Sequence, residues 1–91
     1  MSLNNMYYIL LTTTTCHKCP EFKKYVNENV TFSGVILDER SDLFAKMADK
    51  FNVMNAPTII IFENNGDDIC NLKELFRTSE ISELQEFIEK K

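Results

Sequence analysis

The hydrophobic pattern changes its period within a few residues near the N-terminus. Residues 6–13 are almost continuously apolar, which is typical of a strand covered on both faces. Four consecutive threonines, residues 12–15, have β-branched side chains that favour an extended or loop backbone. From Cys19 onward the apolar residues follow helical spacing, at Phe22, Tyr25, Val26 and Val30. A buried strand that leads directly into a helix predicts an α/β domain.

The next two segments repeat this alternation. Residues 35–37 predict a short buried strand, and one intervening helix implies a right-handed crossover that places it parallel to the first strand. Ser33 and Gly34 are predicted to form a break in the pattern before this second strand. Ser41 is a suitable N-cap for a second helix, which should end near Asn52.

The second half of the chain predicts a hairpin and a last helix. Residues 58–62 predict a third strand, and the Asn64-Asn65-Gly66-Asp67 turn leads to an antiparallel strand over residues 68–72. Residues 73–77 are predicted to be irregular, since their pattern fits either a bulged strand or a helical turn. Ser79 can cap a final helix with the apolar stripe Ile81, Leu84, Phe87 and Ile88. The predicted order is βαβαββα, a four-stranded mixed sheet flanked by three helices.

Length and composition favour one small domain over residues 1–91, with residues 1–5 expected to be disordered or a vector-derived leader. The net charge is −4 and no cationic block is long enough to follow a phosphate backbone, so nucleic acid is excluded as a ligand. The apolar run over residues 6–11 is too short for a signal peptide or a membrane span. We therefore expect a cytoplasmic monomer that binds neither nucleic acid nor membrane.

The spacing of Cys16 and Cys19 is that of a redox dithiol or of half a zinc site. Zinc would need ligands such as His17 and Cys70, but the sequence has no second pair at similar spacing. A haem attachment site would need histidine directly after Cys19, where the chain has Pro20. The spacing therefore favours the dithiol and no metal, and Cys70 is expected to be a small buried side chain, with a regulatory thiol as the alternative.

The element order and two short motifs together resemble the thioredoxin fold at the size of a glutaredoxin. The motifs are the Cys16/Cys19 pair at a helix start and the triplet Ala56-Pro57-Thr58 before the third strand. The resemblance implies a cis peptide bond at Pro57, with the proline against the dithiol. It also implies thiol-disulfide chemistry with no bound cofactor other than the disulfide itself.

The sequence departs from both standard active-site motifs of these proteins. It contains no tryptophan, places Thr15 before the first cysteine, and has His17 and Lys18 between the two thiols. Thr13 stands where glutaredoxins usually have a lysine, and no glycine pair follows the predicted hairpin. These differences argue against glutathione binding.

The position of each cysteine predicts its role. Cys16, nearer the strand end and more exposed, should attack a substrate disulfide, whereas Cys19, further into the helix, should resolve the mixed disulfide. Only the thiolate attacks, and the helix N-terminus, His17 and Lys18 should all stabilise it. Thr15 and the triplet of residues 56–58 are the predicted substrate-binding residues.

The predicted function is therefore reduction of protein disulfides in the cytosol by a mixed-disulfide mechanism. A reductase or glutathione would supply the electrons. Two alternatives stay open: a glutathione-dependent glutaredoxin, and a thioredoxin-fold binding or redox-sensing module without turnover.

Overall fold

The strand β1 (Met6–Leu11) lies inside a four-stranded sheet of order β2-β1-β3-β4. The computed structural model describes residues 6–63 and 73–90. After β1 the chain forms α1 (Cys19–Asn29), β2 (Ser33–Leu37), α2 (Asp42–Lys50), β3 (Thr58–Glu63), β4 (Lys73–Thr78) and α3 (Ile81–Glu89). β1 pairs parallel with β2 and antiparallel with β3, and β3 pairs antiparallel with β4. The predicted βαβαββα fold with a mixed sheet is confirmed.

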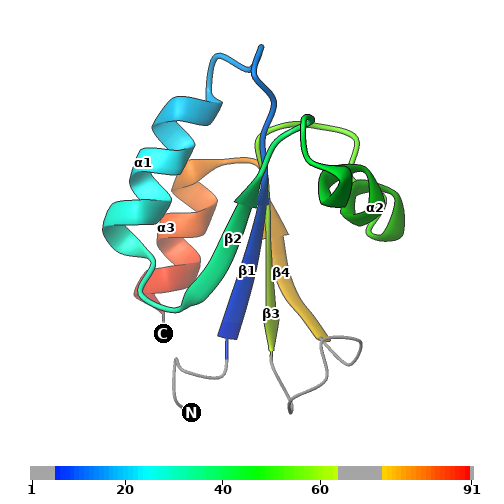
Figure 1. Ribbon diagram of the computed structural model, residues 1–91. Coiled ribbons are helices and arrows are strands. Elements are labelled where there is room, and N and C mark those ends of the chain that lie inside the picture. The colour runs from blue at the N-terminus through cyan, green and yellow to red at the C-terminus, as the bar shows by residue number, and fades with distance from the viewer. Residues whose placement is uncertain (1–5, 64–72, 91) are drawn as a thin grey trace.

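The helices cover the sheet from both sides, with α1 and α3 on one face and α2 on the other (Figure 1). Successive residues of a strand point to opposite faces, so β1 and β3 each supply both cores. The core under α1 and α3 consists of Met6, Tyr8, Leu10, Phe22, Val26, Ile59, Ile61 and Leu84. The core under α2 consists of Ile9, Leu11, Leu37, Ile60 and Phe62. Burial on both faces explains the near-continuous apolar sequence of these two strands.

The edge strand β2 begins earlier than predicted, because Ser33 and Gly34 belong to it. Its parallel register with β1 places Gly34 beside Tyr8. A Cβ atom on Gly34 would collide with the Tyr8 ring, whose nearest atoms include the ring carbon closest to the backbone. The glycine therefore provides room for the tyrosine ring and does not end the strand.

The second helix begins as predicted but ends slightly earlier. The Ser41 side chain accepts a hydrogen bond from the backbone N–H of Leu43 at 3.2 Å, which confirms it as the N-cap. Helix α2 ends at Lys50, and Asn52 has a left-handed φ of 56°. Leu43, in the first turn of this helix, has 42% of its surface exposed.

The prediction of an irregular segment at residues 73–77 is wrong, because Lys73–Thr78 forms the edge strand β4. In its pairing with β3, Ile61 faces Phe76 whereas Phe62 faces Glu74, so Leu75 is the extra residue of a bulge. The bulge breaks the alternation of apolar and polar residues, which explains why the sequence pattern was ambiguous. The predicted turn at residues 64–67 and the return strand at 68–72 lie outside the described residues.

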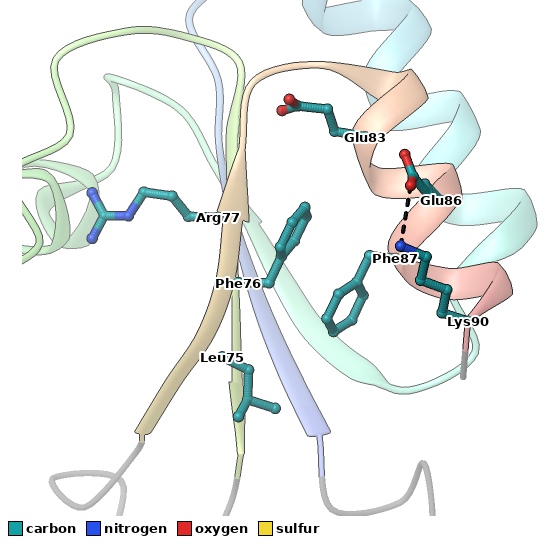
Figure 2. A pocket seen from close by; sticks show the side chains of 7 residues that line it. All are labelled: Leu75, Phe76, Arg77, Glu83, Glu86, Phe87 and Lys90. Carbon is teal, nitrogen blue, oxygen red and sulfur yellow. Dashed lines mark ion pairs between the residues drawn. The ribbon is translucent and has the colours of Figure 1, made fainter.

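The last helix is capped differently from the prediction. Its N-cap is Glu80 and not Ser79. The Glu80 backbone N–H donates to Thr78 Oγ1 at 3.0 Å, and that hydroxyl in turn donates to the Glu83 carboxylate. Figure 2 shows a pocket between this helix and β4, where the rings of Phe76 and Phe87 stack with centroids 4.6 Å apart. None of the predicted site residues lines this pocket.

Candidate active site

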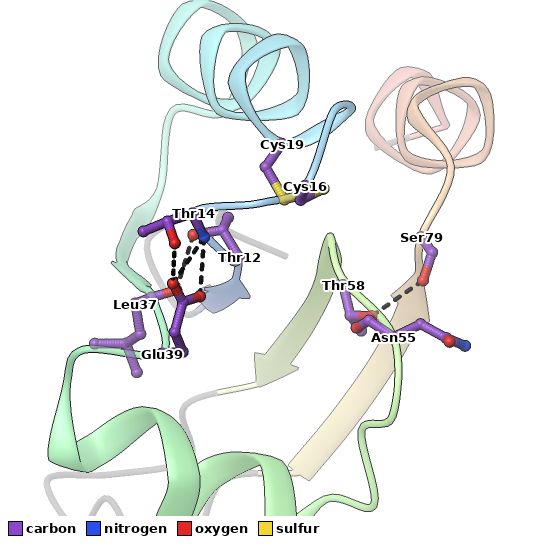
Figure 3. Close-up of a disulfide and its surroundings, with 9 residues drawn as sticks. All are labelled: Thr12, Thr14, Cys16, Cys19, Leu37, Glu39, Asn55, Thr58 and Ser79. Atoms are coloured by element: carbon purple, nitrogen blue, oxygen red, sulfur yellow. Dashed lines mark hydrogen bonds between the residues drawn. A yellow bond between two sulfur atoms is a disulfide. The ribbon is translucent and has the colours of Figure 1, made fainter.

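Cys16 and Cys19 are joined by a disulfide in the segment between β1 and α1 (Figure 3). Their Cα atoms are 5.4 Å apart, within the usual range for a disulfide. The two cysteines differ in exposure, because Cys16 is half-buried whereas only 2% of the Cys19 surface is exposed. The sequence prediction that these thiols form a disulfide is confirmed.

The helix begins at the second cysteine. Cys19 is the first residue of α1, and Lys18 is the N-cap, without a side-chain capping bond. Pro20 lies in the first turn, where its missing N–H costs no helical hydrogen bond. Cys16 therefore precedes the helix and lies on the side of its unpaired N–H groups, which favour negative charge.

The loop that carries Cys16 is tied at its start to the end of β2. Thr12 donates both its backbone N–H and its hydroxyl to the Leu37 carbonyl, at 2.8 and 3.1 Å. The backbone N–H of Cys16 donates to the Thr13 carbonyl at 3.3 Å and closes a turn. Polar bonds thus define the course of the chain from the last residue of β1 to the exposed cysteine.

A second tie joins Thr14 to Glu39 (Figure 3). The Thr14 backbone N–H lies 2.9 Å from each carboxylate oxygen of Glu39, and the Thr14 hydroxyl donates to one of the same oxygens. These bonds hold the pKa of the Glu39 carboxyl below its ordinary value, and the bond from the Thr14 side chain has the largest effect. These bonds therefore favour the ionised form of the Glu39 carboxyl.

The turn that presents Glu39 has its own ion pair. Asp38 accepts the backbone N–H of Arg40 at 2.9 Å, and the Arg40 guanidinium binds the same carboxylate at 2.7 Å. The side-chain bond with Arg40 is the main cause that lowers the pKa of Asp38. The Ser41 backbone N–H donates to the Asp38 carbonyl at 2.9 Å, so the turn is closed on both sides of Glu39.

The predicted triplet lies at the same edge of the sheet as the cysteine loop. Thr58 begins β3 and pairs with Leu11, the last residue of β1. The Ala56–Pro57 peptide bond is cis, the isomer that the resemblance implies, and Pro57 is buried. Strand pairing therefore brings the segment before β3 to the end of β1 from which the cysteine loop leaves.

The Thr58 side chain is engaged inside the protein. Its hydroxyl donates to the Asn55 carbonyl at 2.7 Å and lies 3.0 Å from the Ser79 hydroxyl. Because one hydroxyl has a single proton, Ser79 is the donor in the second bond. The Thr58 hydroxyl thus stabilises the turn before β3, and its predicted role in substrate binding stays a prediction.

The other predicted site residues lie at the surface around the disulfide. Thr15, His17 and Lys18 are all exposed. Lys18 also lines a pocket between the start of α1 and the turn before α3, together with Glu21, Phe22, Ser79, Glu80, Ile81 and Ser82. Their tuning and binding roles stay predictions.

Two residues of this region were not assigned to the site from the sequence. Ser79 was taken as a helix cap, whereas its hydroxyl binds Thr58. Glu39 follows β2, and the carboxyl ends of parallel neighbouring strands meet at one edge of a sheet, so its place after the second strand could have predicted it.

Within residues 6–63 and 73–90, no group of three or more histidine, cysteine, aspartate or glutamate side chains is arranged to hold a metal ion. In the same described residues, no helix combines the length and the hydrophobicity that crossing a bilayer requires.

Comparison with known proteins connects the chain to others through structure alone. No family model matches the sequence, and no curated protein matches it. A thioredoxin from Plasmodium falciparum superposes with a TM-score of 0.76 and 18% identity, over 98% of this chain and 73% of the other. Thioredoxin O2 from Arabidopsis thaliana gives 0.70 and 14%, over 96% and 75% of the two chains. The thioredoxin of Fasciola hepatica gives 0.63 and 21%, over 96% and 81%. The chain therefore has the thioredoxin fold.

Proposed function

We propose that the chain is a thiol-disulfide oxidoreductase that works through Cys16 and Cys19. The observation that carries the proposal is the disulfide itself, placed between a buried strand and a helix start with one half-buried and one buried cysteine. A reversible dithiol needs one sulfur within reach of a partner and a second that is protected until the first has reacted. The thioredoxin fold supports the same function.

The proposed reaction exchanges one disulfide for another. The Cys16 thiolate attacks a sulfur of a protein disulfide, forms a mixed disulfide and releases the first substrate thiolate, which takes up a proton. The Cys19 thiol gives up its proton, and the resulting thiolate attacks the Cys16 sulfur and releases the second substrate thiol. The substrate gains two electrons and two protons, and Cys16 and Cys19 become the disulfide.

The residues around the disulfide have proposed roles in this exchange. The exposed side chains of His17 and Lys18 lie next to the attacking sulfur in the sequence and stabilise its thiolate. The backbone of Thr15 and Ala56 binds an extended substrate segment, with Pro57 beside the disulfide. A reductase or glutathione returns two electrons to the disulfide. We place this cycle in the cytosol, where thiols are normally kept reduced.

The first test is insulin reduction with dithiothreitol as the electron source. We expect the wild-type protein to accelerate the reaction and Cys16→Ser to abolish the acceleration. Cys70→Ser is the matched control, because it removes the third thiol by the same substitution and should keep full activity. If wild type and Cys16→Ser gave the same rate, the protein would be a binding or sensing module and not an oxidoreductase.

The second test identifies the roles and the partners. Cys19→Ser should stall the reaction as a mixed disulfide on Cys16, which a thiol-reducible gel shift detects, whereas Cys16→Ser should trap nothing. Supplying glutathione or a thioredoxin reductase as the only donor then separates the glutaredoxin alternative from a thioredoxin-like cycle. Turnover with glutathione alone would favour the glutaredoxin.

A further inference from the structure

We propose that Glu39 is a positioning residue that holds the cysteine loop through Thr14 and thereby stabilises the Cys16–Cys19 disulfide relative to the dithiol. The inference rests on the proposed function only in so far as the pair cycles between these two states. It starts from the arrangement around Thr14, whose N–H and hydroxyl both donate to one carboxylate from a different loop.

Within residues 6–63 and 73–90, the bonds to Glu39 are the hydrogen bonds closest in sequence to Cys16 that join its loop to another loop. Thr12 is tied to Leu37, but it lies directly after β1 and its bonds mainly continue the sheet. The turn bond from Cys16 to Thr13 is internal to the loop and does not fix the loop relative to the rest of the protein. Apart from the disulfide itself, the Thr14–Glu39 contact therefore joins the exposed part of the loop to another part of the fold.

Glu39 can position the cysteine loop only if its own place in the fold is fixed. It lies between Leu37, the buried end of β2, and Ser41, the N-cap of α2. The Asp38–Arg40 pair closes the turn around it. The bonds to Thr14 are charge-assisted, and such bonds are shorter and about twice as strong as neutral ones. A fixed carboxylate thus acts on a loop that is otherwise exposed to solvent.

The consequence for the cysteines is a higher effective concentration of one thiol near the other. Two protein thiols and glutathione disulfide are in equilibrium with the protein disulfide and two molecules of glutathione. The protein loses two electrons and two protons, and glutathione disulfide takes them up to become two molecules of glutathione. The more closely the loop holds Cys16 near Cys19, the less conformational freedom is lost when their bond forms. Loss of the bonds to Glu39 should therefore shift the equilibrium toward the dithiol.

The experiment measures this equilibrium in buffers of defined glutathione ratio. Samples are quenched with acid and alkylated, and mass spectrometry of peptides containing Cys16 and Cys19 gives the fraction reduced. We expect Glu39→Ala to shift the constant toward the dithiol by about threefold to tenfold, where tenfold corresponds to about 30 mV. Thr14→Val removes the hydroxyl bond but keeps the backbone N–H bonds, so it should shift the constant in the same direction by a smaller factor. Thr14→Ser keeps the hydroxyl and should restore the wild-type value. Glu28→Ala, at an exposed glutamate of α1, is the matched control.

Thr14→Val separates positioning from simple charge. If Glu39 acted only through its negative charge near the thiolate, Glu39→Ala would still favour the dithiol, but Thr14→Val would leave that charge in place. The constant for Thr14→Val would then be unchanged or would move toward the disulfide. Either of these results would overturn the proposal, and so would a failure of Thr14→Ser to restore the wild-type constant.

The equilibrium can be measured whether or not the protein reduces insulin. A wild-type protein that forms the disulfide reversibly but lacks reductase activity would contradict the proposed function and leave the role of Glu39 open to the same test. If the wild-type protein were fully active and neither Glu39→Ala nor Thr14→Val changed the dithiol–disulfide equilibrium, only the positioning role would be contradicted. Urea unfolding of each variant shows whether the fold is intact.

Discussion

The contact between Gly34 and Tyr8 makes a quantitative prediction about the edge of the sheet. The φ angle of Gly34 lies outside the left-handed region, so its backbone accepts an alanine. The three atoms nearest to the added methyl group all belong to the Tyr8 ring. Tyr8 is 9% exposed, and its ring packs edge-on against that of Phe32, with centroids 6.0 Å apart. Overfilling a packed site costs about 1–3 kcal/mol. A stiffer unfolded chain returns about 0.4–1 kcal/mol. The difference between these two ranges is about 0–2.6 kcal/mol. Because the atoms that the methyl group would meet include the ring carbon closest to the backbone, we expect Gly34→Ala to lower the free energy of unfolding by an amount in the upper part of this range.

The assay is urea unfolding of the oxidised protein in two backgrounds. In Tyr8→Val the ring is absent, so Gly34→Ala should become neutral or stabilise the protein by about 0.4–1 kcal/mol. The loss of stability should therefore disappear or reverse in the Tyr8→Val background. An equal loss of stability in both backgrounds would show that the backbone, and not the tyrosine ring, requires glycine, and would refute the reasoning.

Three further predictions concern the disulfide, the core and pH. Reducing the disulfide, which links residues separated by 3 in the sequence, should lower the unfolding free energy by about 2 kcal/mol, and equal urea midpoints with and without reductant would contradict this. Leu84→Ala should cost about 2–5 kcal/mol because Leu84 is fully buried, whereas Leu43→Ala, at a side chain 42% exposed, should cost less than about 1 kcal/mol; similar losses would argue against the packing of α3. The bonds from Arg77 lower the pKa of Glu74, so this pair stabilises the fold above the ordinary glutamate range and loses its effect as the pH falls through the lowered value. Glu74→Gln should make the unfolding free energy depend less on pH in this acidic range. The same pH dependence in the variant and in the wild type would contradict the prediction.

The order of the elements could be predicted from the sequence because each core strand is buried on both faces and each helix has one apolar stripe. The failures share a different cause. Leu75 is an unpaired bulge residue, so β4 has no regular alternation to recognise. Gly34 looks like a turn residue, whereas it is needed for a ring on the neighbouring strand. Both depend on contacts between strands, which a local pattern does not contain.

The candidate site divides in the same way. Cys16 and Cys19 were predictable because their spacing is local and their chemistry is specific. Glu39 contacts Thr14 across 25 positions of sequence, and Ser79 contacts Thr58 across 21. A single exposed glutamate or a serine before a helix has many ordinary explanations, so only the parallel pairing of β1 with β2 identifies the carboxylate as part of the site.

The interactions that hold the chain change from apolar packing to hydrogen bonds just before the disulfide. As far as Leu11, the first strand is fixed by apolar packing on both faces, and Leu10 and Leu11 have no exposed surface. Beyond it, the chain as far as Cys16 is held by hydrogen bonds that Thr12 donates to the Leu37 carbonyl and Thr14 donates to the Glu39 carboxylate. The bonds to Glu39 are exposed, and exposed polar bonds contribute little to global stability but fix local geometry. Substitutions in the core should therefore change the unfolding free energy and leave the dithiol equilibrium near its wild-type value. Substitutions at the Thr14–Glu39 contact should instead shift the dithiol equilibrium. The same shift should appear in the difference between the unfolding free energies of the oxidised and the reduced protein, because the unfolded chain lacks this contact.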